Sequence, residues 1–219
     1  MVPGNPAESM GFAMRDRVGG RERVLGDALD AARVGNADGF AWLWRAYQPG
    51  LLRYLRVLVG PAAEDVASET WLRVARDVSA FRGNADGFRV WLLRVARNRA
   101  IDDRRWVRRR PPEELVEPGW VPDTGTPDAW AGAVEQLDTE WALAVIGTLP
   151  RDQAEAVLLR VVVGLDVTGT AKVLGKRPGA VRVATLRGLR RLAEHSEIRQ
   201  RGAAVGATGV TRRSAATPG

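Results

Sequence analysis

Two adjacent carboxylates, Asp102 and Asp103, are the residues of this sequence whose type and spacing most directly suggest chemistry. A pair of aspartates can hold a metal ion for phosphodiester hydrolysis. Neighbouring residues on a helix point about 100° apart, however, so these two carboxylates would not converge on one ion. Arginines crowd the same stretch, and ion pairing with them is the favoured interpretation. The stretch therefore predicts binding rather than hydrolysis, with its arginines available for phosphates.

Cysteine and histidine are almost absent from the sequence. The sequence has no cysteine and one histidine, His195. Neither a disulfide framework nor a thiolate metal site can form, and we expect no cofactor. His195 sits near a predicted helix end, where a cation complements the helix dipole, so we assign it no chemistry.

The charge of the chain points to a polyanionic partner. Its 219 residues carry 33 Lys and Arg against 26 Asp and Glu, a formal net charge of +7. Binding of clustered cations to phosphates releases counterions and gains entropy. Nucleic acid is therefore the first candidate partner, and an anionic membrane surface is the second. The first residues lack the apolar run of a signal peptide, and no later segment is long enough to span a bilayer. We therefore expect a cytoplasmic protein with no membrane partner.

The helix that must carry the two aspartates changes character along its length. Between Gly87 and Pro111, its first half repeats large apolar residues at helical spacing and its second half is basic. Earlier helical periods begin at Arg23, continue to Tyr47 and resume in a second run after the sequence "QPG". No segment shows the β-branched alternation of a strand. The expected fold class is all-α.

Composition divides the chain into two helical blocks and three looser segments. We expect two small helical domains joined by an extended linker, the C-terminal one a helix-turn-helix. The expected boundaries are 1–22 for a flexible N-terminal arm, 23–110 for the first domain, 111–133 for an acidic Pro/Gly linker, 134–196 for the second domain and 197–219 for a disordered tail.

The second block contains a short helix, a turn and a basic helix. Gly175 stands where a left-handed cap would end the short helix, and Pro178 suits the start of the basic one. The residues expected to point inward from the basic helix are Val181, Leu189 and Leu192. Its arginines are left mostly outward, as in a helix-turn-helix whose second helix enters the major groove. An ordinary helical hairpin with a solvated basic face is the alternative.

Six of the eight tryptophans divide into two groups. Those on apolar faces, which we expect in the core, are Trp44, Trp71 and Trp91. Those in or near the basic end and the linker, which are candidates for exposed contacts, are Trp106, Trp120 and Trp130.

Two regions of the sequence together resemble a known family. The stretch "AEDVASETWLRVARDVSAFRG", followed by "FRVWLLRVARNRAIDDRRWVRRRP", closely resembles the promoter-melting domain of the extracytoplasmic-function sigma factors of bacterial RNA polymerase. The stretch "LPRDQAEAVLLRVVVGLDVTGTAKVLGKRPGAVRVATLRGLRRL" resembles the helix-turn-helix domain of the same family. The two motifs occur in the right order and cover most of residues 25 to 195. The resemblance implies a sigma factor, which binds core RNA polymerase and directs it to specific promoters.

At the −10 element the resemblance implies a pocket that captures unstacked bases. The loop from Phe81 to Gly87 and the amide of Asn98 would form it, and an amide offers both a donor and an acceptor to a base edge. The neighbouring arginines would hold phosphates. The residues expected at the −10 element are Phe81, Arg82, Asn84, Arg97, Asn98, Arg104, Arg105 and Arg108.

The resemblance also implies two further surfaces. The last helix would read the −35 element, with expected contacts at Arg177, Ala180, Arg182, Val183, Leu186, Arg187 and Arg190. The helix with the sequence "AEDVASETWLRVAR" would dock on a coiled coil of the largest polymerase subunit, with expected contacts at Glu64, Asp65, Glu69 and Arg73. Without the resemblance, the second surface reads as a solvated acidic helix turn.

The expected partners are core RNA polymerase and promoter DNA, and the resemblance leaves open an anti-sigma factor as another. No enzymatic activity is expected. The alternative function is an autonomous helix-turn-helix repressor or activator, which would bind its operator without polymerase. An enzyme acting on nucleic acid is a distant third.

Overall fold

The computed structural model describes residues 20, 22–107, 139–196 and 198. The chain divides into two compact units, Met1–Glu114 and Leu115–Gly219, and each is described here by itself. Across the described ranges every regular element is helical and no strand occurs, which confirms the expected all-α class. Within the same ranges, no helix is both long and apolar enough to cross a membrane.

Several sequence-based expectations fall outside the described ranges. They are most of the 1–22 arm, the whole 111–133 linker, most of the 197–219 tail, and the side chains of Arg108, Trp120 and Trp130. The expected domain boundaries and the expected contact at Arg108 therefore stay predictions.

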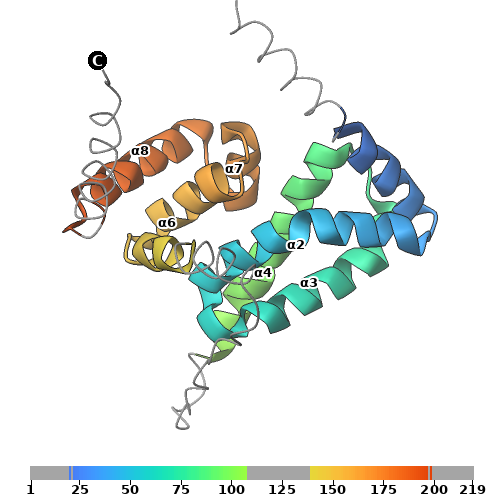
Figure 1. Ribbon diagram of the computed structural model, residues 1–219, viewed down its shortest axis with the longest axis horizontal. Helices are drawn as coiled ribbons and strands as arrows, with labels where there is room; N and C mark the ends of the chain where they lie inside the picture. The colour runs from blue at the N-terminus through green and yellow to red at the C-terminus, as the bar shows by residue number, and fades with distance from the viewer. Residues whose placement is uncertain (1–19, 21, 108–138, 197, 199–219) are drawn as a thin grey trace, which may run out of the picture. The chain divides into compact units, whose positions relative to one another are not determined.

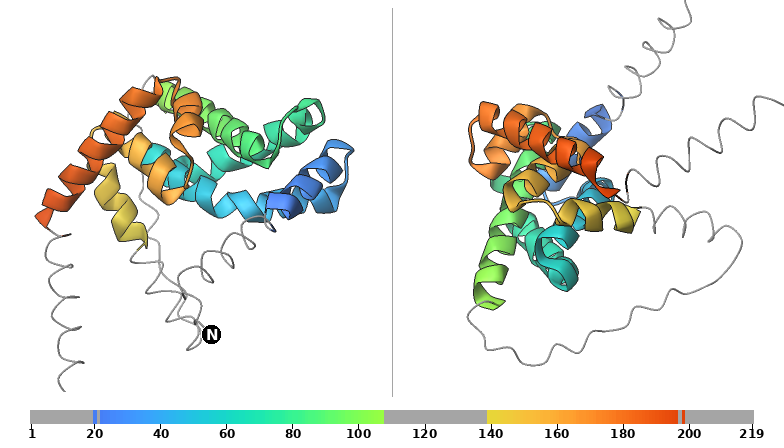
Figure 2. Two further views of the ribbon diagram at one scale, coloured as in Figure 1. Left: turned by 90° about the horizontal axis from the view of Figure 1, so that it is seen from above. Right: turned by 90° about the vertical axis from the view of Figure 1, so that its left-hand side faces the viewer.

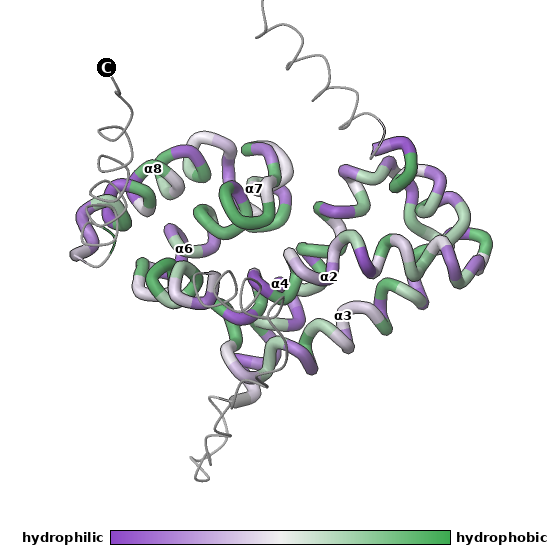
Figure 3. The backbone as a smooth tube through the Cα atoms, in the orientation of Figure 1, coloured by the Kyte–Doolittle hydropathy of each residue, from purple (hydrophilic) through white to green (hydrophobic). Residues whose placement is uncertain are grey.

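The first unit packs three long helices around one core (Figure 1). A helix over residues 22–33 precedes α2 (Ala37–Val59), α3 (Ala63–Asp77) and α4 (Ala85–Val107), and short 3₁₀ turns join α2 to α3 and follow α3. α2, α3 and α4 all contact one another. The largest fully buried side chains of this unit are Leu29, Leu43, Leu51, Tyr54, Leu55, Val74, Phe88, Leu92 and Leu93. Figure 3 shows apolar and polar residues alternating along these helices, as amphipathic packing requires.

α2 is continuous where the sequence predicted two runs. Pro49 lies inside the helix and is exposed, while Leu43 before it and Leu51 after it are both buried. A proline in a helix interior costs about 3 kcal/mol or more. Each large apolar side chain buried on either side contributes roughly 1.5–3 kcal/mol, so burial of both halves in one core outweighs the break.

The core expectation for the tryptophans is right for Trp71 and wrong for Trp44. Trp71 is buried, and its indole N–H donates to Gln48 Oε1 at 2.6 Å. Trp91 is half-buried, and Trp44 is 44% exposed. The residue before Trp44, Leu43, takes the inward position, and adjacent helical positions point about 100° apart.

The described part of the second unit contains four helices, of which the last two form a helix-turn-helix (Figure 2). A helix over residues 139–147 precedes α6 (Arg151–Val157), which continues into one π-helical turn (Leu158–Val162). α7 (Val167–Leu174) and α8 (Pro178–Glu194) complete the unit. Gly175 ends α7 in the left-handed conformation, with φ 65°, as the sequence predicted.

The inward face of α8 differs from the expected one at a single position. Val181 and Gly188 are buried and Leu192 is half-buried, but Leu189 is 42% exposed. Gly188 takes the inward place because α8 approaches α6 closely there. A Cβ at Gly188 would lie 2.7 Å from Val157 Cγ2.

Gly188→Ala should therefore destabilise the protein, although alanine is the better helix former. Overpacking costs about 1–3 kcal/mol, while the helix gains at most about 1 kcal/mol from losing a glycine, so we expect a net loss of up to about 2 kcal/mol. Urea denaturation of the full chain measures it. Gly179→Ala on the same helix is the matched control, because nothing lies within 4 Å of a Cβ there. Equal effects of the two substitutions would contradict the close approach of α6 and α8.

Candidate nucleic-acid interface

The loop before α4 is held by an asparagine cap. Asn84 Oδ1 accepts a hydrogen bond from the Gly87 N–H at 2.9 Å, and the Asn84 carbonyl accepts from Phe88 N at 2.9 Å. This satisfies backbone donors that the first turn of a helix leaves without partners. The amide oxygen of Asn84, expected at the −10 element, therefore starts α4, and its role toward DNA stays a prediction.

An aromatic cluster fixes the beginning of that loop. The Phe81 ring stacks on Trp91 with centroids 5.1 Å apart, and it meets Phe88 edge-on at 5.7 Å. Tyr47 packs on Phe88 at 5.7 Å, and its hydroxyl donates to the Ala85 carbonyl at 3.3 Å. Ring contacts thus join Phe81 of the loop to α4, and Tyr47 joins α4 to α2.

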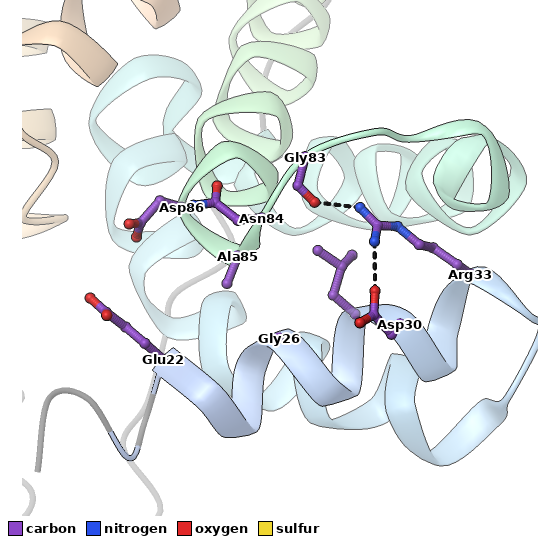
Figure 4. Close-up of a pocket in the computed structure, with 9 residues that line it drawn as sticks. Glu22, Gly26, Asp30, Arg33, Gly83, Asn84, Ala85 and Asp86 are labelled. Carbon is purple, nitrogen blue, oxygen red and sulfur yellow. Dashed lines mark hydrogen bonds and ion pairs between the residues drawn. The ribbon is translucent and has the colours of Figure 1, made fainter.

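Asn98 lies on the exposed face of α4, in a depression of about 320 Å³. The depression is lined by Arg73, Asp77, Trp91, Arg94, Val95, Asn98, Arg99 and Asp102. Trp91 links the two parts of the expected base pocket, because it lines this depression and stacks on Phe81. Gly83 and Asn84 line a different pocket, beside the helix over residues 22–33 (Figure 4).

The basic end of α4 carries both cations and anions. Arg105 is exposed and lies 3.8 Å from Asp102, which agrees with ion pairing for that aspartate. Arg97 and Arg104 are half-buried. Over the described part of the chain, no three His, Cys, Asp or Glu side chains cluster as metal ligands would. Arg82 is exposed and donates to the carbonyls of Ser79, at 2.8 Å, and Phe81, at 3.1 Å.

α3 exposes all four residues expected to bind core polymerase. They are Glu64, Asp65, Glu69 and Arg73, and Val66 and Trp71 are buried on the other side. Two of the four already have intramolecular partners, since Glu69 pairs with Arg99 of α4 and Arg73 lies 3.3 Å from Asp77.

Sequence reasoning missed Leu72 on the same face of α3. Its side chain is 66% exposed and lies one helical turn after Glu69. The signal was present, because Leu72 falls out of phase with the buried positions Val66, Thr70 and Val74. An exposed leucine buries apolar area when a partner covers it, so we add Leu72 to the candidates for contact with core polymerase.

All seven residues expected to meet the −35 element are exposed on α8 or at its N-cap, namely Arg177, Ala180, Arg182, Val183, Leu186, Arg187 and Arg190. Val181 is 0% exposed and fixes the rotation of the helix. The turn before α8 is held by Lys176, whose Nζ lies 2.6 Å from Asp152 of α6. Asp166 Oδ1 caps α7 by accepting from Gly169 N at 2.7 Å. The arrangement presents one basic helix face outward.

Comparison with known families assigns both units to one class of protein. Residues 43–110 match Sigma-70 region 2, and residues 139–192 match Sigma-70 region 4. The geometry described above, a three-helix core followed by a helix-turn-helix, is therefore that of a sigma-70 type transcription initiation factor.

Individual relatives narrow the class. The ECF RNA polymerase sigma factor BldN of Streptomyces coelicolor is 33% identical over 172 residues, which cover 76% of this chain and 64% of that protein. The ECF RNA polymerase sigma factor ShbA of Streptomyces griseus is 32% identical over 180 residues, which cover 77% of this chain and 93% of that protein. The structure of CnrH in complex with the cytosolic domain of CnrY matches 78% of this chain and 96% of that chain, with TM-score 0.56 and 20% identity, and supports the fold.

The chain belongs to the extracytoplasmic-function (ECF) sigma factors, the subunits that direct RNA polymerase to promoters. Sigma factors are non-catalytic DNA-binding regulators, and their partners are core RNA polymerase and promoter DNA. The resemblance seen in the sequence is confirmed, and the alternative of an autonomous regulator is not favoured.

Proposed function

We propose that the two units divide promoter recognition between them. α8 reads the −35 element, α4 with the loop before it captures an unstacked base of the −10 element, and α3 docks on core polymerase. The observation that carries this proposal is the outward face of α8. There Arg182, Arg187 and Arg190 are exposed while Val181 is fully buried, so the helix offers its cations and not its apolar anchor.

Two apolar residues within that basic face support a role in reading bases. Val183 is 47% exposed and Leu186 is 50% exposed, and both lie among arginines. A solvated helix face gains nothing from exposed valine and leucine, whereas the methyl group of thymine in the major groove is read by apolar contact. Arginines beside them supply guanine recognition and phosphate binding.

The depression around Asn98 supports capture of a base by α4. Trp91 supplies an aromatic wall, Asn98 supplies an amide edge, and Arg94 supplies a cation within one lining. Stacking of a base on an aromatic side chain contributes about 1–3 kcal/mol, and the amide can match a base edge. These are the components that a site for an unstacked nucleotide requires.

We further propose that the protein has no active site of its own and works in the cytoplasm. RNA synthesis is the chemistry of the polymerase that it binds. The exposed pair of Asp102 with Arg105 supports ion pairing, and not metal binding, as the role of that aspartate. An anti-sigma factor is a further candidate partner. CnrH, a protein of the same fold, has been solved in complex with another protein, the cytosolic domain of CnrY.

Asn98→Ala tests the −10 assignment. We expect opening of the promoter to fall by about two- to tenfold, because one hydrogen bond contributes roughly 0.5–1.5 kcal/mol. Permanganate reactivity of thymines in the −10 element of a holoenzyme complex measures opening. Core binding should not change, and the isosteric Asn98→Asp separates loss of the amide donor from loss of the whole side chain. Unchanged opening with Asn98→Ala would remove Asn98 from the pocket.

A further inference from the structure

Arg33 connects the helix over residues 22–33 to the loop before α4, fifty positions further along the chain. Its Nη2 donates a hydrogen bond to the Gly83 carbonyl, and its Nη1 lies 2.6 Å from Asp30 Oδ1 (Figure 4). Its guanidinium carbon also lies 5.6 Å from the centroid of the Phe81 ring. Asp30 therefore orients one side of the guanidinium, and the other side binds the loop.

The loop that Arg33 holds is tightly wound around Phe81. Gly83 adopts φ 158°, and a Cβ there would lie 2.8 Å from Phe81 Cζ. Phe81 in turn stacks on Trp91, which lines the depression around Asn98. A continuous set of contacts thus leads from Arg33 through the loop to the wall of the proposed base pocket.

We propose that Arg33 is a positioning residue for capture of the −10 base. It does not touch DNA, and it acts by fixing the Gly83 carbonyl and the Phe81 ring before the base arrives. The inference rests on the proposed function of the loop and Asn98. It goes beyond the family match, because Arg33 precedes residues 43–110, which match Sigma-70 region 2. Without Arg33 the loop must be ordered when the base binds, and that cost reduces affinity for the base.

The test uses holoenzyme assembled from core polymerase and the full chain. Single 2-aminopurine substitutions along the non-template −10 strand report which base leaves the stack. We expect Arg33→Ala to lower the 2-aminopurine fluorescence at the captured base. We also expect it to shorten the lifetime of the open complex about three- to tenfold. The lifetime should also be shorter on a template whose −10 region is already unpaired, because the variant impairs capture of the base and not separation of the strands.

Two further variants distinguish positioning from charge. Arg23→Ala removes an equally charged residue from an exposed place on the same helix and should leave the signal unchanged. Arg33→Lys keeps the charge but loses the planar fork that serves Gly83 and Asp30 together, so it should behave like Arg33→Ala. Full activity of Arg33→Lys would overturn the proposal.

Three other results would also overturn it. If Arg33→Ala reduces the salt dependence of DNA binding by the equivalent of one phosphate contact, Arg33 contacts DNA directly. A fall in melting temperature and core binding that matches the loss of opening would make its role only structural. A normal 2-aminopurine signal for Arg33→Ala would reject the inference while leaving the base pocket intact, provided that Asn98→Ala lowers the signal. If neither variant lowers it, the proposed pocket itself is wrong.

Discussion

Arg182→Ala is expected to relax the base preference of the −35 element, while Arg190→Ala weakens binding to every promoter by the same factor. Both side chains are exposed on α8. Arg182 follows the buried Val181 in the early part of the helix, which faces base edges in a helix-turn-helix. Arg190 lies about two turns later, where the helix leaves the groove. The first arginine therefore carries sequence information, and the second neutralises a phosphate.

The two losses differ in kind as well as in size. A guanidinium bidentate to guanine discriminates by about 1–3 kcal/mol against other bases, so Arg182→Ala should flatten preference at one or two positions. Arg190→Ala should reduce the salt dependence of binding by about one phosphate contact. Transcription from a library of randomised −35 elements, paired with salt titrations of holoenzyme binding, measures both. If Arg182→Ala lowers all promoters equally, α8 lies differently in the groove.

Leu72→Asp should abolish most of the affinity for core polymerase. Leu72 is 66% exposed in the middle of the α3 face that also presents Asp65 and Glu69. Burying a leucine in an interface contributes about 1.5–3 kcal/mol, and a buried aspartate without a partner adds a desolvation cost. We expect affinity to fall at least about tenfold. Titration of labelled core polymerase with the variant measures this loss.

A matched control separates this effect from a general response to an added charge. Val34 is 84% exposed in the turn after the helix over residues 22–33 and is not part of α3, so Val34→Asp should leave core binding unchanged. Circular dichroism should show both variants folded, since exposed substitutions usually change stability by within about 0.5 kcal/mol. Normal core binding by folded Leu72→Asp would reject α3 as the docking surface. Glu69 is a poorer probe, because its pairing with Arg99 makes any change there reach α4.

The helical pattern and the helix-turn-helix were predictable because apolar periodicity and capping residues act locally. Asp166 starts α7 and Gly175 ends it, each through a hydrogen bond within a few residues. Periodicity failed at Leu189, because the buried neighbour Gly188 has no side chain that a pattern can register. It failed at Pro49 because burial of residues on both sides, which is a tertiary effect, holds α2 together.

The candidate site was predictable as a set of exposed residues and not as a set of contacts. Exposure follows from helix phase, so the outward places of Arg182 and Asp65 could be read from the sequence. The pairing of Glu69 with Arg99 and the bond from Arg33 to Gly83 join different helices. Such contacts depend on how helices pack, which spacing along one helix does not specify.

The dependence of promoter binding on polymerase tests the central claim most directly. A DNA site is first selected from genomic fragments by retention on the protein and core polymerase together, and the purified protein is then tested on it by gel shift and run-off transcription, with and without core polymerase. We expect a sequence-specific complex and a run-off transcript only when core polymerase is present. Specific binding by the protein alone, with no transcript when core polymerase is added, would contradict a sigma factor and indicate an autonomous helix-turn-helix regulator.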